Sequence, residues 1–256
     1  ARVHIVTAAV TNAQNLVRSA QKCGLNVADI ILQPLASSEA CLTEEERDLG
    51  VALIDIGGGT TDIAMWNNGA ICHTNVLTLG GNHLTNDIAQ VLRTPSNEAE
   101  RIKQRYGCAV HSMTEGGETI EVPTPGNRAP RILPRRMLTE VIEPRAEEIF
   151  TLARQDMEKT HLLSQMGGGI VVTGGSTLMD GMTEQAESVF NMPVRTGIPR
   201  GITGLVDVVR SPMYATGVGL VLFGSKHLDS RHFKVRDDNI YNKVMGRMRS
   251  WLSDIF

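Results

Sequence analysis

Short apolar runs alternate with longer amphipathic segments along most of the chain. Apolar runs bounded by glycine, proline or asparagine predict buried strands, and segments with apolar residues three and four positions apart predict helices. Their order mixes hairpins with α/β units, so we expect an α/β fold in which mixed sheets are flanked by helices. The expected strands are 3–8, 30–35, 51–56, 62–66, 70–79 and 170–173, and the expected helices are 12–23, 84–93, 96–106, 135–163, 179–190 and 212–223.

Three further segments complete the folded part of this pattern. A short β-hairpin is expected to turn at 115–117, and a loop rich in proline and glycine is expected over 123–134. Pro144 lies inside the long predicted helix, where it is expected to introduce a kink or to mark the first turn. The strongly polar segment 225–239 is expected to be a linker.

The last sixteen residues carry the pattern of an amphipathic helix. From Tyr241 onwards apolar residues fall at i, i+3, i+4 and i+7, and basic residues occupy much of the remaining surface. A basic helix with aromatic anchors behind a polar linker is typical of an interfacial membrane helix, although a helix docked on its own domain or in a partner's groove would look similar. The residues expected to bind the membrane are Val244, Met248, Trp251, Leu252, Ile255 and Phe256.

Composition narrows the classes of function. The 256 residues are 41% hydrophobic and 21% charged, which is enough to bury one large core or two medium ones. A net charge of -3 gives no overall reason to expect nucleic acid as a partner. The four cysteines are widely spaced and indicate reduced thiols, and no histidine spacing predicts a metal site. No apolar run approaches the roughly 20 residues that cross a bilayer, and no signal peptide is visible, so we expect a chain that neither spans a membrane nor is exported. The chain begins at Ala1 inside a predicted strand, and an upstream part is therefore expected to be missing.

The first glycine turn has the chemistry of a phosphate cradle. Asp55 closes an apolar strand, and three glycines and two threonines follow it. Glycines let backbone N–H groups approach phosphates, and threonine hydroxyls add donors. Asp55 would then hold a Mg²⁺ ion or its bound water. A glycine-rich hairpin turn beside a buried aspartate is the alternative.

The second glycine turn follows another apolar strand. Gly174 and Gly175 lie between the predicted strand 170–173 and a helix, at the sheet edge where ligands of open α/β sheets bind. Taken alone, this turn is equally consistent with tight packing and with nucleotide contact. It lies more than a hundred residues after the first turn, with a predicted helical insertion between the two.

Together the two turns resemble the actin, Hsp70 and sugar-kinase superfamily, in which the first is the second phosphate loop and the second is the adenosine motif. The segment 212–217 is similar to the connecting helix between the two lobes of that fold. The resemblance implies two actin-like (ribonuclease H-like) lobes around an ATP cleft, with nearly all of the second lobe present here. The nucleotide contacts that it implies are Asp55, Gly57, Gly58, Gly59, Thr60, Thr61, Glu100, Lys103, Gly174, Gly175 and Ser176.

Several short segments of the sequence resemble the FtsA family of bacterial cell-division proteins, and the resemblance runs over essentially the whole chain. The segments that carry this resemblance are 36–40, 55–64, 80–82, 87–89, 99–103, 106–109 and 141–145. It implies a protein that binds ATP and Mg²⁺, polymerises, tethers the FtsZ ring to the cytoplasmic face of the inner membrane at the division site, and recruits later division proteins through a missing subdomain IC. ATP hydrolysis would be slow or incidental. The alternatives are a small-molecule kinase, a chaperone ATPase or an actin-like pilus-assembly protein.

The same resemblance divides the chain into subdomains. Residues 1–50 would be the remainder of lobe I, comprising the end of IC and part of IA. The rest would be IIA (51–94 and 165–211), IIB (95–164), the connecting helix (212–224), a polar linker (225–240) and the membrane-targeting helix (241–256).

Two charged groups acquire roles from this division. Glu100 and Lys103 lie one helical turn apart, on a face that the family places beside the adenosine, and a solvated ion pair is the alternative. Forked guanidinium groups suit the acidic C-terminal tail of FtsZ, which the family binds in IIB, and a solvated charged face is the alternative. The arginines expected to meet that tail are Arg131, Arg135, Arg136 and Arg145.

Overall fold

The computed structural model describes residues 3–114, 116–126, 128–204 and 206–227. Chain contacts separate it into two units, each described by itself. The larger unit holds residues 31–226 together with the start of the chain to His4, and the smaller unit includes residues 5–30. The smaller unit contains helix α1 (Val10–Lys22), which confirms the helix predicted there and ends just before Gly24 at a positive φ of 77°.

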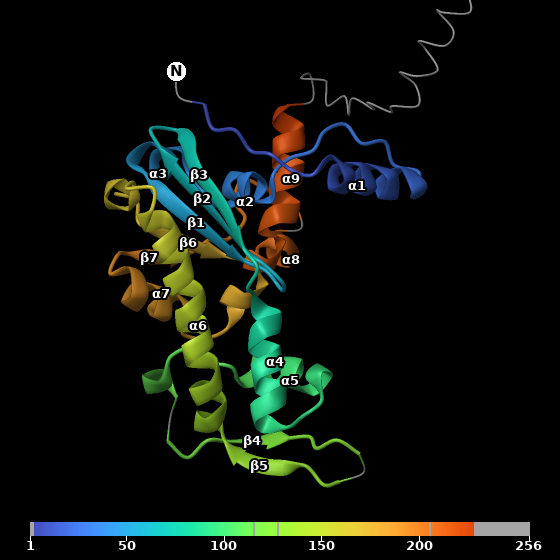
Figure 1. The fold of residues 1–256 in the computed structure, drawn as a ribbon, viewed down its shortest axis with the longest axis vertical. Coiled ribbons are helices and arrows are strands. Elements are labelled where there is room, and N and C mark those ends of the chain that lie inside the picture. The colour runs from blue at the N-terminus through green and yellow to red at the C-terminus, as the bar shows by residue number, and fades with distance from the viewer. Residues whose placement is uncertain (1–2, 115, 127, 205, 228–256) are drawn as a thin grey trace, which may run out of the picture. The chain divides into compact units, whose positions relative to one another are not determined.

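A five-stranded mixed sheet forms the centre of the larger unit (Figure 1). The order is β3–β2–β1–β6–β7, with antiparallel pairing among the first three strands and parallel pairing of β6 with β1 and of β7 with β6. The sheet confirms the predicted mixture of a meander with α/β units. The strands are β1 (Val51–Ile56), β2 (Thr61–Asn67), β3 (Ala70–Leu77), β6 (Ile170–Thr173) and β7 (Val194–Thr196).

Helices cover both faces of this sheet. Strand β1 is apolar at every position but one, so both of its faces must be shielded from water. Val51 and Leu53 point into a core shared with α2 and α9, while Ile54 and Ile56 point into a larger core shared with α4, α5, α6 and α7. The larger core continues past the end of the sheet, where α4, α5 and the lower part of α6 meet a two-stranded hairpin (Figure 1). The helices are α2 (Gln33–Cys41), α3 (Glu44–Leu49), α4 (Gly81–Leu92), α5 (Ser96–Tyr106), α6 (Arg135–Glu158), α7 (Met182–Phe190), α8 (Val206–Val209) and α9 (Ala215–Lys226), with 3-10 turns η1 (His111–Met113), η2 (Leu163–Gln165), η3 (Gly175–Leu178) and η4 (Pro212–Tyr214).

Two predicted strands are wrong. Residues 3–8 are not in a strand, although His4 Nε2 lies within hydrogen-bonding distance of Thr74 Oγ1 of β3, at 2.9 Å. A segment with a strand-like pattern forms a strand only where a neighbouring strand accepts and donates its backbone hydrogen bonds. The segment 30–35 instead leads into α2, because Pro34 lies in the first helical turn, where a missing N–H leaves no hydrogen bond unmade.

The hairpin and the long helix also differ from the pattern. The predicted turn at 115–117 is wrong: β4 (Thr119–Val122) pairs antiparallel with β5 (Arg131–Pro134), so the connection spans 123–130. The last third of the predicted loop, residues 131–134, is therefore strand. The long helix α6 contains Pro144 as expected but ends at Glu158, five residues early, shortly before His161 adopts a positive φ of 58°. Helix α7 begins at Met182, three residues later than expected, because Met179 is extended and Gly181 has a positive φ of 77° directly before the helix.

Candidate functional site

A cavity of about 390 Å³ lies where the two glycine turns meet. Its walls come from the turn after β1, the start of α4, the middle of α5, and the turns η3 and η4. Both β1 and β6 run parallel and end at this edge of the sheet. The lining residues are Gly57, Gly58, Gly81, Asn82, Leu84, Glu100, Lys103, Gln104, Gly175, Ser176, Leu178, Met179 and Met213.

Hydrogen bonds fasten the glycine turns to one another. The carbonyl oxygen of Gly57 accepts from the Gly81 backbone N–H at 2.9 Å and from Ser176 Oγ at 3.1 Å. A Cβ on Gly81 would come within 2.5 Å of Ser176 Oγ, so the Ser176 hydroxyl would have to turn away from Gly57 to admit a larger residue there. A Cβ on Gly58 would meet only the Asn82 side chain, at an ordinary 3.5 Å. Packing therefore leaves Gly58 free to serve a ligand.

Lys103 is the cation of the cavity wall. Its ammonium donates to Gly81 O at 2.9 Å, to Thr85 Oγ1 at 2.8 Å and to Glu100 Oε2 at 2.7 Å, and its side chain is 10% exposed. Burial opposes ionisation of Glu100, but the hydrogen bonds from Lys103 and Thr85 outweigh it and hold the pKa of that carboxyl below its ordinary value. The pair thus belongs to the cavity rather than to an open helix face.

Asp55 lies behind the cavity lining and is 3% exposed. Its Oδ2 accepts from Ser37 Oγ of α2 at 2.6 Å and from Thr216 Oγ1 of α9 at 3.2 Å. Gly174 has a φ of 93°, and a Cβ there would come within 2.5 Å of Asp55 Oδ1. Two helices and the second glycine turn therefore meet at one carboxylate.

Asp62 was not among the predicted site residues. The β1–β2 register places it directly opposite Asp55, and it is 4% exposed. Burial, and then the charge of Asp55, raise the pKa of Asp62 to about 6, although Thr60 donates to it at 3.3 Å. The only signal in the sequence is the spacing of seven residues between Asp55 and Asp62 across a tight hairpin. That spacing predicts a pair only when the register of the two strands is known.

The remaining predicted nucleotide residues lie outside the lining. The Thr61 hydroxyl is fully buried and donates to Leu79 O at 2.9 Å, and a Cβ on Gly59 would meet open space. The structure thus brings six predicted residues to the cavity and leaves five beside or behind it. Those in the lining are Gly57, Gly58, Glu100, Lys103, Gly175 and Ser176, and those outside it are Asp55, Gly59, Thr60, Thr61 and Gly174.

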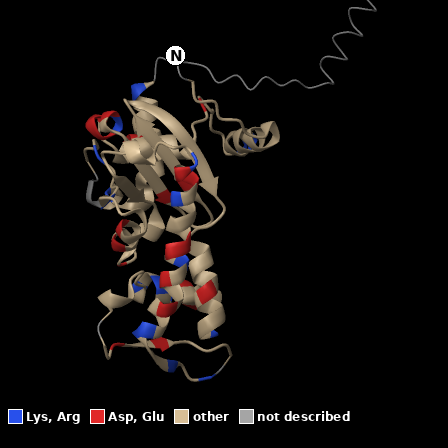
Figure 2. Ribbon diagram, turned by 60° about the vertical axis from the view of Figure 1, so that its left-hand side comes forward, with Lys and Arg blue, Asp and Glu red and all other residues tan. Residues whose placement is uncertain are grey.

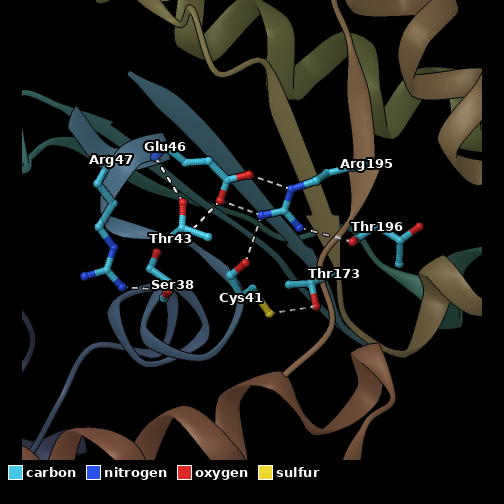
Figure 3. Close-up of polar contacts among 8 residues, drawn as sticks. All are labelled: Ser38, Cys41, Thr43, Glu46, Arg47, Thr173, Arg195 and Thr196. Carbon is cyan, nitrogen blue, oxygen red and sulfur yellow. Dashed lines mark hydrogen bonds and ion pairs between the residues drawn. The ribbon is translucent and has the colours of Figure 1, made fainter. Parts of the chain in front are cut away.

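An ion-pair clamp holds α2 against the sheet (Figure 3). Thr43 and Glu46 form a capping box at the start of α3, and Arg195 of β7 donates to both Glu46 oxygens at 2.7 and 2.6 Å. The same guanidinium donates to the carbonyl oxygen of Cys41 at 2.9 Å, at the end of α2. Burial raises the pKa of the Cys41 thiol to about 11. The clamp fixes the helix that delivers Ser37 to Asp55.

The four predicted arginines have separate partners. Arg131 donates to Leu92 O, and Arg135 donates to Tyr106 O at 2.8 Å and to Glu118 at 2.8 Å. The guanidinium of Arg145 binds Asp87 at 2.6 and 3.2 Å and also pairs with Glu148. The side chain of Arg136 is 68% exposed, compared with 19% for Arg135 and 29% for Arg145. Acidic and basic residues are interspersed over the helices near the hairpin (Figure 2).

The predicted membrane helix and nearly all of the predicted linker lie outside the described residues, apart from the end of α9, which runs two residues into the linker to Lys226. Within the described part of the chain, every helix is too short or too polar to cross a bilayer.

Comparison with known proteins identifies the family. The profile of the family described as "Cell division protein FtsA" matches residues 52–219. Cell division protein FtsA of Pseudomonas aeruginosa is 47% identical over 262 residues, and that of Escherichia coli strain K12 is 42% identical over 265 residues. Both matches cover 100% of this chain and 63% of the relative, so the chain spans less than two thirds of their length.

Solved structures agree on the fold. MreB5 of Spiroplasma citri bound to ADP superposes with a TM-score of 0.70 at 20% identity, over 86% of this chain and 66% of that one. The MamK double helical filament superposes with a TM-score of 0.61 at 16% identity, over 85% of this chain and 66% of that one. These structures show an actin-like fold. The profile match and the two relatives above 40% identity show more: the chain belongs to the FtsA family of cell-division proteins.

Proposed function

We propose that the protein is an ATP-binding, actin-like scaffold that links the FtsZ ring to the cytoplasmic face of the inner membrane at the division site. The observation that carries the proposal is the closure of two glycine turns, more than a hundred residues apart in sequence, on one cavity that contains a lysine. Support comes from MreB5 of Spiroplasma citri, which has the same fold and is described as bound to ADP and to AMPPNP. ATP hydrolysis in this proposal is slow or incidental.

The cavity offers suitable groups for each part of a nucleotide. Backbone N–H groups around Gly57 and Gly58 suit the phosphates, and Gly175 with Ser176 suits the ribose. Leu178 and Met213 are exposed at the rim by 55% and 54%, which gives an apolar surface for the base.

The neighbouring carboxylates fit a magnesium ion. Asp55 and Asp62 are hard oxygen donors beside the phosphate turn. Burial raises the pKa of Asp62, and the negative charge of Asp55, which the ion would offset, raises it further. Asp55 would hold Mg²⁺ through a bound water, while its hydrogen bonds to Ser37 and Thr216 keep the carboxylate in place. The ion supplies charge neutralisation next to the phosphates when it is bound.

Gly58→Ala tests the nucleotide site without disturbing the fold. The added methyl makes ordinary contact with Asn82 and occupies space at the cavity wall, so the unfolding midpoint should stay that of the parent. ATP affinity of the full-length protein, measured by calorimetry, should fall at least about tenfold, which corresponds to about 1.4 kcal/mol. Gly116→Ala adds a Cβ that would meet nothing within 4 Å and lies outside the cavity lining, so this variant should bind like the parent. Equal affinities of all three proteins would refute the phosphate-cradle assignment.

The FtsZ contact is proposed for the IIB region, residues 95–164. Arg136 presents an exposed guanidinium at the start of α6, and Arg131 precedes it on β5. Arg145, paired with Asp87, borders a small cavity of about 190 Å³ together with Val141 and Pro144, where an acidic and apolar peptide could exchange carboxylates. Subdomain IC, which would contact late division proteins, is expected in the part of the relatives that this chain does not span.

Membrane attachment is proposed for the amphipathic helix that the sequence predicts over residues 241–256. One amphipathic helix binds lipid reversibly, but several helices in one actin-like filament would raise the avidity by about 10² or more. Self-association therefore converts a weak anchor into a firm one. The MamK filament shows that a protein of this fold can polymerise.

A further inference from the structure

Arg135 lies at the junction between the cavity wall and the β4–β5 hairpin. It is the first residue of α6 and follows β5 directly, while Glu118 directly precedes β4. The Arg135 backbone N–H donates to Glu118 O at 2.9 Å, and its Nη1 donates to the Glu118 carboxylate at 2.8 Å. These two bonds fix the base of the hairpin.

The other guanidinium nitrogens of Arg135 reach two segments of the cavity wall. Nε donates to Tyr106 O at 2.8 Å, at the end of α5, and Nη2 lies 3.7 Å from the Asp180 carboxylate. Lys103 of α5 and Met179, the residue before Asp180, both line the cavity. Arg135 itself is not part of that lining, so any effect on a ligand is transmitted through these neighbours.

The two wall segments are also fastened to each other. Cys108 and Asp180 form a parallel β-bridge, and the Ala109 backbone N–H donates to Asp180 O at 2.8 Å. A Cβ on Gly107 would come within 2.7 Å of Met179 Sδ, so the end of α5 packs directly on the cavity turn. A ligand that shifts the turn at 179–180 would therefore pass that shift to the groups that hold the Arg135 guanidinium.

We propose that Arg135 is a positioning residue that transmits occupancy of the cavity to the β4–β5 hairpin, so that nucleotide binding changes the order of the hairpin. The inference rests on the proposed function, because it needs a nucleotide in the cavity. It also gives Arg135 a different role from that of a peptide contact. Its side chain is 19% exposed, whereas that of the next residue, Arg136, is 68% exposed.

Hydrogen exchange of the hairpin strands, residues 119–122 and 131–133, tests the inference in the full-length protein with and without saturating AMPPNP and Mg²⁺. In the parent, bound AMPPNP should change the exchange rates of these amides by about threefold or more. Arg135→Ala should bind AMPPNP within about threefold of the parent affinity, while its hairpin no longer responds. Arg136→Ala removes an exposed ion pair with Glu140 from the same helix and should respond like the parent.

Asp180→Asn keeps the test decisive if Arg135→Ala does not fold. Its side chain is 72% exposed, and the change removes the charge that Arg135 meets on the cavity turn while keeping the Ala109 backbone bond. We expect its hairpin response to fall to less than half that of the parent. An undiminished response in this variant would overturn the inference, as would an equal loss in Arg136→Ala or a parent hairpin unaffected by bound AMPPNP. A parent that fails to bind AMPPNP contradicts the proposed function itself, and the inference falls with it.

Discussion

The crossing of α2 and α9 depends on Gly219 having no side chain. A Cβ at Gly219 would come within 1.7 Å of the carbonyl oxygen of Ala36, far inside the 3.0 Å that real Cβ contacts respect. Gly219→Ala must therefore push the two helices apart. Overpacking costs about 1–3 kcal/mol, and this clash is with backbone, which has no rotamer to yield, so we take the upper part of that range. Better helix propensity returns about 1 kcal/mol, which leaves a net loss of about 2 kcal/mol in the free energy of unfolding.

Gly217→Ala is the matched control for this change. It lies in the same helix, two residues earlier, and its Cβ would meet nothing within 4 Å. The propensity gain should therefore appear alone and raise the free energy of unfolding by up to about 1 kcal/mol. In urea unfolding the two variants should differ by about 3 kcal/mol. Equal stabilities would refute the described packing of α2 against α9.

A second substitution identifies the clashing atom. Ala36→Gly removes a methyl group but leaves the carbonyl oxygen that meets residue 219. Adding it to Gly219→Ala should therefore restore none of the lost stability. Recovery in the double variant would show that side chains, rather than backbones, set the distance between these helices.

The remaining predictions concern charge and attachment. The folded-state pKa of Asp62, about 6, lies above its ordinary 3.8, so the stability contributed by its protonated form is full below about pH 3.8 and is lost as the pH rises to 6. Asp62→Asn should accordingly stabilise the fold by at most about 3 kcal/mol at pH 7.5 and by about half as much at pH 5 in urea unfolding, and a gain that does not change with pH would contradict the burial argument. Arg145→Glu should weaken binding of an FtsZ C-terminal peptide at least about tenfold in fluorescence anisotropy at fixed salt, whereas Lys159→Glu, the same charge change beyond the far end of α6, should not; equal effects would move the site elsewhere. Trp251→Glu and a chain ending at Asp238 should both lose liposome flotation while ATP binding survives, and flotation of both at the parent level would exclude the tail as the anchor.

The sequence predicted the parts of the fold that depend on local chemistry. Strand β1 and the glycine turn after it follow from an unbroken apolar run closed by Asp55 and three glycines. The helix 96–106 was predicted with its observed bounds, since Pro95 and Gly107 delimit it on both sides. About half of the cavity lining was predicted, because the two glycine turns can be recognised from the local sequence. Asn82 and Met213 reach the lining only through tertiary packing, which the local sequence does not indicate.

The parts that failed depend on long-range partners. The segment 3–8 has a strand pattern, but its hydrogen bonds would need a neighbouring strand that the described chain does not place there. The hairpin turn was misplaced because Gly116 and Gly117 carry a stronger turn signal than the actual connection at 123–130. Asp62 was overlooked because the β1–β2 register, rather than residue type, brings its carboxylate opposite Asp55.

The surroundings of Asp55 connect these observations to function. The side chains that bond it among the described residues are the hydroxyls of Ser37 and Thr216, which orient the carboxylate but leave its charge in place. That charge is what raises the pKa of Asp62, after burial itself. A buried pair of acids held by neutral donors is costly unless a cation joins it, and a magnesium nucleotide brings one. Because Ser37 lies on α2 and Thr216 on α9, and their hydroxyls are 2.9 Å apart, the groups that orient this carboxylate also link the two helices whose crossing Gly219 permits. The glycine at the crossing and the hydroxyls at the carboxylate are therefore parts of one arrangement, in which the packing of the two helices and the position of the buried charge behind the cavity are not independent.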